Sequence, residues 1–350
     1  MSLIRMSSPH VTRSNSSRGV MQLVLFAMIP GLIALTAFFG WGTLIQLAIC
    51  LAAGLLFEAI ALKLRGMPIS YYLNDYSAVV TAALLAVSIP PSAPYRVGIV
   101  GMFVAIMIGK QVYGGLGNNP FNPAMVAYAL LLVSFPVQMS GWNLPYVLVD
   151  QSSWGIPSFN ETLSVVLGQP SAIIDSYSGA TPLDILRNQG AATTEELWRN
   201  NVTLKDGVAA YHAVAAAWFM GGIFLLYRKV FTWHTPFSLL MTLFIVSALF
   251  YGYDPSNYVD PFNQITLGAA MLGAFFIATD PVSSATSNRG RIVFGIGIGL
   301  LIFIIRTWGN YPDAAAFSVL LMNLAAPMID HYTQPRSYGH KRARVGPKGK

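Results

Sequence analysis

The segment 175–181 reads Asp-Ser-Tyr-Ser-Gly-Ala-Thr and holds the residues of this chain best suited to chemistry. Three small residues precede Thr181, so its hydroxyl is presented with little steric cover, and the carboxylate of Asp175 lies earlier in the same segment. Pro182 and a helix-like run, Leu-Asp-Ile-Leu-Arg, follow. An accessible hydroxyl in such a turn is open to chemistry at its oxygen, although the same pattern is also typical of a plain polar turn.

The cysteine and histidine content excludes several kinds of site. Cys50 is the single cysteine, so an intramolecular disulfide, a CxxC zinc site and a protein-supplied four-thiolate iron–sulfur cluster are excluded. The five histidines form no HxxxH or HExxH pair, and we expect no metal site from this chain alone. No glycine fingerprint for a dinucleotide follows a strand, so we assign no catalytic residue and expect NAD chemistry in partner proteins.

The elements that must position Thr181 are membrane helices. With 54% hydrophobic and 10% charged residues, the chain is too apolar for a soluble domain. Charged residues are absent from 19–57 and 111–149, and a span needs about 20 apolar residues. We expect ten transmembrane helices, at about 20–39, 43–62, 76–89, 95–112, 123–139, 208–227, 236–253, 264–279, 292–306 and 314–331.

The expected organisation follows from these spans. A segment 1–19 precedes helices one to five in 20–139, a polar loop occupies 140–207, helices six to ten occupy 208–331, and a basic tail covers 332–350. Sixteen of the 21 Lys and Arg residues fall on the side of the N-terminus. Short cytoplasmic loops retain positive charge. We therefore expect both termini in the cytoplasm and the loop in the periplasm, and we attribute the net charge of +7 to topology rather than to nucleic acid binding.

The two halves show signs of an internal duplication. Two five-helix halves necessarily have opposite orientations, as in inverted-repeat transporters. Gly-Asn-x-Pro opens the fifth expected helix of each half, at 117–120 and 309–312. The third helices are both rich in small residues and closed by proline. We expect an all-α polytopic membrane protein of two inverted five-helix halves; ordinary packing of small residues between helices is the alternative.

Together these features resemble the NqrB/RnfD family of membrane proteins. The resemblance covers nearly the whole chain: the motif in the loop between helices five and six, GGLGNNPFNPA at 114–124 and ATDPVSSATSNRGR at 278–291. The RnfD branch, from Rnf (Rsx) ion-translocating electron transport complexes, fits better than the NqrB branch, from the sodium-pumping NADH:quinone reductase. The reason is that only about twenty residues precede the first span, whereas NqrB proteins usually carry a longer extension.

The resemblance implies a cofactor, a fold and partners. Thr181 would carry FMN through a phosphoester, installed by a separate flavin transferase that recognises Asp175, Ser178, Gly179 and Ala180. The fold would be urea-transporter-like, in the bacterial inner membrane. The complex would couple electron transfer between ferredoxin and NAD to proton or sodium movement, with partner subunits of the Rnf A, B, C, E and G type.

A second flavin site is a further expectation. Family members are thought to hold a non-covalent flavin, such as riboflavin, in the membrane. Amides and an aromatic ring gather at a helix break formed by Asn118, Asn119, Phe121 and Asn122. Amides can donate and accept at the edge of a flavin while a ring packs on its face. The alternative is an ordinary Asn-Pro helix cap.

Two carboxylates lie at span depth, where burial of an unpaired charge is costly. Glu58 is close enough in sequence to pair with Lys63 or Arg65, and Asp280 lies at the proline-terminated end of the eighth span. Each is a candidate for an ion pathway, and interfacial capping is the alternative reading. For the whole chain, the alternative outside redox chemistry is a solute channel or transporter of the same plan, in which the threonine motif is accidental.

Overall fold

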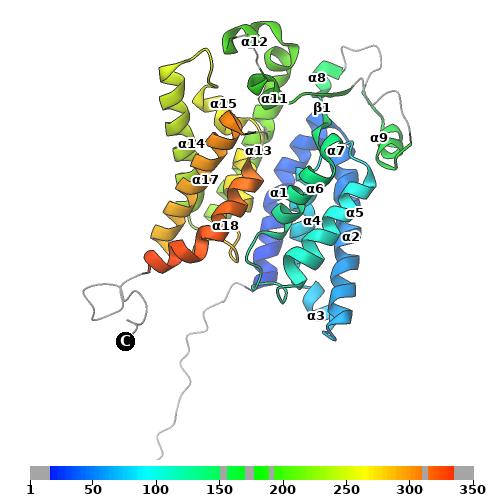
Figure 1. The fold of residues 1–350 in the computed structure, drawn as a ribbon. Helices are drawn as coiled ribbons and strands as arrows, with labels where there is room; N and C mark the ends of the chain where they lie inside the picture. The colour runs from blue at the N-terminus through cyan, green and yellow to red at the C-terminus, as the bar shows by residue number, and fades with distance from the viewer. Residues whose placement is uncertain (1–15, 150–155, 170–176, 189–192, 310–313, 335–350) are drawn as a thin grey trace, which may run out of the picture.

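The computed structural model describes residues 16–149, 156–169, 177–188, 193–309 and 314–334, and it is mostly helical. Two groups of helices stand side by side (Figure 1). The first group contains α1 (Ser17–Phe39), α2 (Gly42–Leu64), α3 (Ile69–Leu73), α4 (Ser77–Ser88), α5 (Tyr95–Phe103) with the π-helix η1 (Val104–Gln111), and α6 (Pro123–Ser134). The second contains η2 (Thr203–Gly207) with α13 (Val208–Tyr227), α14 (His234–Tyr253), α15 (Pro261–Thr266), α16 (Ala270–Leu272) with η3 (Gly273–Ile277), α17 (Asn288–Trp308) and α18 (Ala315–Tyr332).

Short elements connect the two groups. They are α7 (Pro136–Ser140), β1 (Trp142–Asn143), α8 (Tyr146–Val149), α9 (Phe159–Val166), β2 (Ser178–Gly179), α11 (Pro182–Arg187) and α12 (Thr194–Asn200). Figure 1 shows α8, α9, α11 and α12 at one end of the bundle, whereas α1 begins and α18 ends at the other. The connecting segment therefore forms a layer over one end of the helices.

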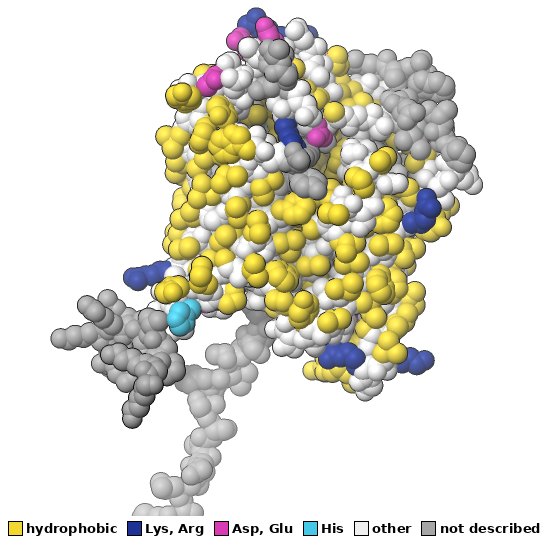
Figure 2. Space-filling model, viewed as in Figure 1, with side chains coloured by type: hydrophobic (Ala, Val, Ile, Leu, Met, Phe, Trp, Pro, Cys, Tyr) yellow, Lys and Arg dark blue, Asp and Glu magenta, His cyan; other side chains and the backbone are white. Residues whose placement is uncertain are grey.

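In the part of the chain that the structure describes, five helices are long and apolar enough to cross a membrane. They are α1, α2, the continuous helix Thr203–Tyr227, α14 and α17. Two shorter apolar helices are Ser77–Ser88 and Pro123–Ser134. On the face seen in Figure 2, hydrophobic side chains form the middle band, and most charged side chains lie toward the two ends. This distribution is that of a polytopic membrane protein.

Two expected spans differ from the helices observed. The expected span 264–279 is divided, because the chain leaves α15 at Thr266 and resumes at Ala270. Gly268 lies between them with φ +69, a left-handed conformation that glycine adopts without strain. The expected span 123–139 ends early, at Ser134, because Pro136 cannot donate a helical hydrogen bond and starts α7 instead.

The two groups meet along α1 and α13, and along α6 and α18. Glycines allow the first contact: a Cβ atom on Gly221 would lie 2.1 Å from the carbonyl O of Ala27, and one on Gly31 would lie 2.5 Å from the Trp218 ring. Small residues let helix backbones approach closely where lipid supplies no hydrophobic drive for association. The interface between the groups therefore depends on the absence of these side chains.

Candidate functional site

The small residues of the threonine motif pair with the start of the connecting segment. In the two-stranded sheet, Gly179 lies opposite Trp142 and Ser178 opposite Asn143, antiparallel. A Cβ atom on Gly179 would lie 2.8 Å from a methyl carbon of Leu144, so the glycine permits this close approach. Just before it, the carbonyl of Tyr177 accepts a hydrogen bond from the Leu144 amide at 2.8 Å. Tyr177, Ser178 and Gly179 are thus held by backbone pairing with residues 142–144.

Thr181 is the N-cap of α11. Its Oγ1 donates to Asp184 Oδ2 at 2.7 Å, and it accepts from the Asp184 amide at 3.3 Å. The Thr181 amide in turn donates to Asp184 Oδ2 at 3.3 Å, which completes a capping box. Pro182 at the first helical position favours the same start. The threonine side chain is therefore held in one orientation by its own helix.

Helix α11 is anchored by two leucines. Leu183 and Leu186 form a buried cluster with Leu204 of η2 and with Leu267, which lies in the break after α15. Tyr211 of α13 packs against the edge of this cluster. Thr181 therefore sits at the end of a short helix that rests on the second helix group.

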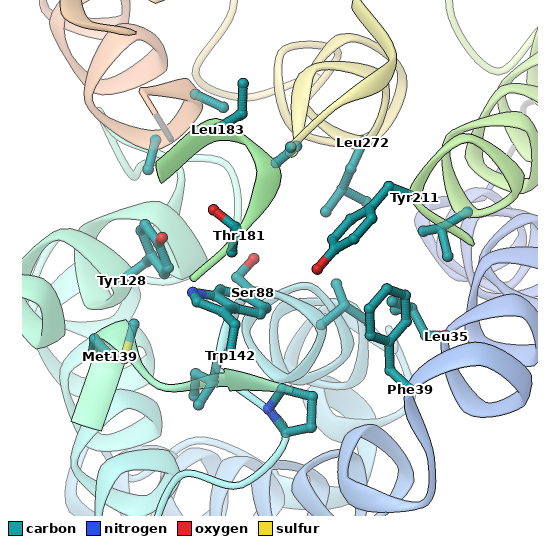
Figure 3. A pocket seen from close by; sticks show the side chains of 18 of the residues that line it. Leu35, Phe39, Ser88, Tyr128, Met139, Trp142, Thr181, Leu183, Tyr211 and Leu272 are labelled. Atoms are coloured by element: carbon teal, nitrogen blue, oxygen red, sulfur yellow. The ribbon is translucent and has the colours of Figure 1, made fainter. Parts of the chain in front are cut away.

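A cavity of about 410 Å³ opens beside Thr181 and lies between the two helix groups. Its lining includes Phe39 and Tyr128 from the first group, Tyr211 and Trp218 from the second, and Trp142 from β1. Figure 3 shows Thr181, Ser88 and Tyr211 around the same space, with the rings of Trp142 and Phe39 beside them. Pockets for drug-sized ligands measure about 300–1,000 Å³ and are mostly apolar with a few polar groups. The aromatic lining of this cavity therefore fits a planar ligand.

The remaining residues of the motif have different environments. Ala180 is exposed, Ser178 and Gly179 are half-buried, and Tyr177 is buried. Burial also raises the pKa of Tyr177, so it stays protonated near neutral pH. The expected Asp175 lies outside the described residues.

None of the four residues expected at the second flavin site lines this cavity. The Asn122 side chain caps α6, accepting from the amides of Ala124 at 3.1 Å and Met125 at 3.3 Å. Asn119 is buried and donates to the carbonyl of Phe121 at 2.9 Å, while Asn118 is exposed. The capping reading of Asn122 is thus realised, and the Oδ1 atom of Asn119 is buried with no hydrogen bond among the described residues.

Glu58 pairs with a residue that its local sequence does not suggest. The expected partners were Lys63 or Arg65, but Glu58 Oε1 accepts from Lys110 Nζ at 2.8 Å and from Gln111 Nε2 at 2.7 Å. Both side chains of the ion pair are 3% exposed. Sequence reasoning missed Lys110 because the contact joins α2 to η1, where spacing along one helix carries no information.

The ion pair belongs to a wider polar network. Lys110 also donates to Ser77 Oγ at 2.7 Å, and Arg65 Nη1 donates to Gln111 Oε1 at 2.5 Å. The second candidate, Asp280, accepts from Ser283 Oγ at 2.6 Å in the segment between η3 and α17. The structure therefore places Glu58 in the first helix group and Asp280 in the second, each with its own partners.

Comparison with known proteins agrees with this architecture. The model of the NQR2, RnfD, RnfE family matches residues 4–339. A protein of Cellvibrio japonicus, the D subunit of an ion-translocating oxidoreductase complex, is 48% identical over 350 aligned residues, covering 98% of this chain and 97% of that protein. Proteins of the same name from Ectopseudomonas mendocina and Vibrio atlanticus are 48% and 47% identical, over 99% and 95% of this chain and 98% of each relative.

Both the extent of the family match and the identity over nearly the full length of each relative are far above what chance or a shared fold alone produces. The chain belongs to the NQR2, RnfD, RnfE family.

Proposed function

We propose that this chain carries FMN as a phosphoester on Thr181 and holds the flavin ring in the adjacent cavity. The chain is the D subunit of an ion-translocating oxidoreductase complex, as its family and its relatives indicate. The observation that carries the flavin proposal is the position of Thr181, whose side chain lines an aromatic cavity while its neighbours lie in an outer layer of the fold. An attachment site in such a layer is reachable by a transferase.

The residues around the cavity have distinct tasks in this proposal. The capping box orients Thr181, and the leucine anchors of α11 hold that helix against the second group. The rings of Trp142, Tyr128 and Phe39 can pack on a planar ligand and exclude water. The Tyr211 hydroxyl can donate to the polar edge of that ligand, and Ser88 Oγ, which donates its own proton to the carbonyl of Leu84, can accept from it. When bound, the flavin supplies one- and two-electron transfer. The protein supplies retention and placement.

The topology that we propose has ten spans in two inverted halves of urea-transporter-like fold, in a bacterial inner membrane. Support comes from the contacts of α1 with α13 and of α6 with α18, which join the first helices and the fifth helices of the two halves. The connecting segment lies at the opposite end of the bundle from the start of α1 and the end of α18 (Figure 1). We place that segment in the periplasm and both termini in the cytoplasm.

The partners that we propose would supply metal and NAD chemistry. Among the described residues, no group of three His, Cys, Asp or Glu side chains could hold a metal ion. We propose that iron–sulfur and NAD chemistry belongs to other subunits, of the Rnf A, B, C, E and G type; the single cysteine, Cys50, could not supply a four-thiolate cluster. A flavin transferase would act during maturation.

Two further assignments remain proposals. Asn118, Asn119, Phe121 and Asn122 would line a site for non-covalent riboflavin, supported by the buried Oδ1 atom of Asn119. Glu58 and Asp280 would lie on an ion pathway, supported for Glu58 by its buried polar network. Glu58→Gln should lower ion transport while electron transfer continues; unchanged transport would remove Glu58 from the pathway.

The test of the flavin proposal is the intact mass of the full chain, produced together with a flavin transferase. We expect a gain of one FMN less one water in the parent chain and in Thr181→Ser, and no gain in Thr181→Ala. Thr193→Ala is the matched control, because Thr193 also caps a helix of the same segment through a capping box with Glu196. Loss of flavin in Thr193→Ala, or its retention in Thr181→Ala, would contradict the assignment.

A further inference from the structure

A buried arginine bonds to the break between α15 and α16. Arg306 lies near the end of α17 and is 5% exposed. Its Nη1 atom donates to the carbonyl of Gln264 at 2.6 Å, and its Nη2 atom donates to the carbonyl of Leu267 at 3.2 Å. The last carbonyls of a helix have no partner within that helix. The guanidinium therefore satisfies groups that the end of α15 exposes.

The segment that Arg306 bonds to contributes both to the cavity wall and to the leucine cluster under α11. Thr266 and Gly268 line the cavity beside Thr181. Leu267 lies between them, and its side chain packs in the cluster that anchors Leu183 and Leu186 of α11. One guanidinium thus fixes both a wall of the cavity and the surface on which the Thr181 helix rests.

We propose that Arg306 is a positioning residue that sets where Thr181 lies relative to the cavity. It acts through Leu267 and the leucine cluster, without contact to Thr181. A planar guanidinium can bridge the carbonyls of Gln264 and Leu267, whereas the ammonium of a lysine is a compact point charge on a flexible stem. The consequence for the flavin rests on the proposed attachment at Thr181, but the consequence for α11 does not.

The first test uses the full chain produced without a flavin transferase. Amide hydrogen exchange is measured for Arg306→Lys, Arg306→Met and the control Arg291→Met. Arg291 is also on α17, at the other end of that helix, and its side chain donates to Thr232 Oγ1 in the turn between α13 and α14 at 3.0 Å. We expect the amides of α11 to exchange about tenfold faster in both Arg306 variants, because local opening there costs less free energy. Exchange in α9 and in the control should stay unchanged.

The second test uses the same variants produced with the transferase. Intact mass should still show the covalent flavin, while its fluorescence rises about twofold because the ring is less confined among aromatic side chains. Absence of flavin from the parent chain would remove the proposed function and leave the exchange result standing.

The positioning role of Arg306 would be overturned if the α11 amides exchanged at an unchanged rate in both Arg306 variants. It would also be overturned if the faster exchange extended equally to α9. If Arg306→Met fails to fold, Arg306→Lys decides. Failure of both variants to fold would assign Arg306 to general stability instead.

Discussion

Removing the Lys110 ammonium should destabilise the fold far more than removing an exposed partner. Lys110→Met leaves the Glu58 carboxylate 3% exposed, without the cation that lies 2.8 Å away and with Gln111 as its remaining donor. Breaking a buried ion pair from one side costs about 3–5 kcal/mol, because the remaining charge stays desolvated. At about 2 °C per kcal/mol, as for larger domains, Tm should fall by roughly 6–10 °C.

The chain offers a control for the same chemical change at the surface. Arg199 and Glu195 form an ion pair at 2.6 Å, but each side chain is 75% exposed. Exposed pairs contribute about 0.2–1 kcal/mol, so Arg199→Met should lower Tm by no more than about 2 °C. The difference between the two variants isolates the effect of burial.

The double variant Glu58→Gln with Lys110→Met tests the cause. Replacing both members of a buried pair by uncharged residues of similar size is often close to neutral. We therefore expect the double variant to regain most of the Tm lost in Lys110→Met, measured by thermal unfolding of the full chain in detergent. A double variant as unstable as Lys110→Met, or a Lys110→Met variant that matches Arg199→Met, would refute the desolvation argument.

Two further predictions concern packing and topology. Gly221→Ala should lower Tm by several degrees, because its Cβ atom would lie 2.1 Å from the carbonyl O of Ala27. The control Gly252→Ala, whose Cβ atom would have no atom within 4 Å, should leave Tm unchanged. Equal changes of Tm in the two variants would show that the packing of α1 on α13 does not depend on this contact. In a Cys50→Ala background, an impermeant maleimide applied to intact spheroplasts should label Asn160→Cys but label Lys63→Cys only after permeabilisation, and the reverse pattern would invert the proposed topology.

The helices that were predicted best from the sequence are those marked by a continuous apolar run. A long apolar run with few charges is enough to define α1, α2 and α14, whose bounds lie close to the expected spans. The division of the expected span 264–279 was missed, because Gly268 in an apolar run is equally typical of packed membrane helices. A helix break of this kind is recognised only from its contacts with other helices, such as those of Arg306 with Gln264 and Leu267.

The site divides in the same way. The Thr181 motif is contiguous, so its residues and the following helix start were readable from order alone. The cavity could not be predicted from the order of residues, because Phe39, Tyr128 and Tyr211 come from helices that are distant in the sequence. The Lys110 partner of Glu58 was missed for the same reason, and its π-helical setting in η1 also has no clear sequence signature.

The cap of α11 has a consequence for the order in which a holoprotein could be made. In the unmodified chain, the proton of Thr181 Oγ1 is donated to Asp184, and Asp184 receives the Thr181 amide as well. A phosphoester at that oxygen has no proton to donate, and it brings a phosphate anion next to the same carboxylate. If FMN is attached there, as we propose, the donation from Thr181 Oγ1 to Asp184 would be lost, and the Asp184 carboxylate would have to move away from the phosphate. Maturation would then include a local rearrangement of the first turn of α11.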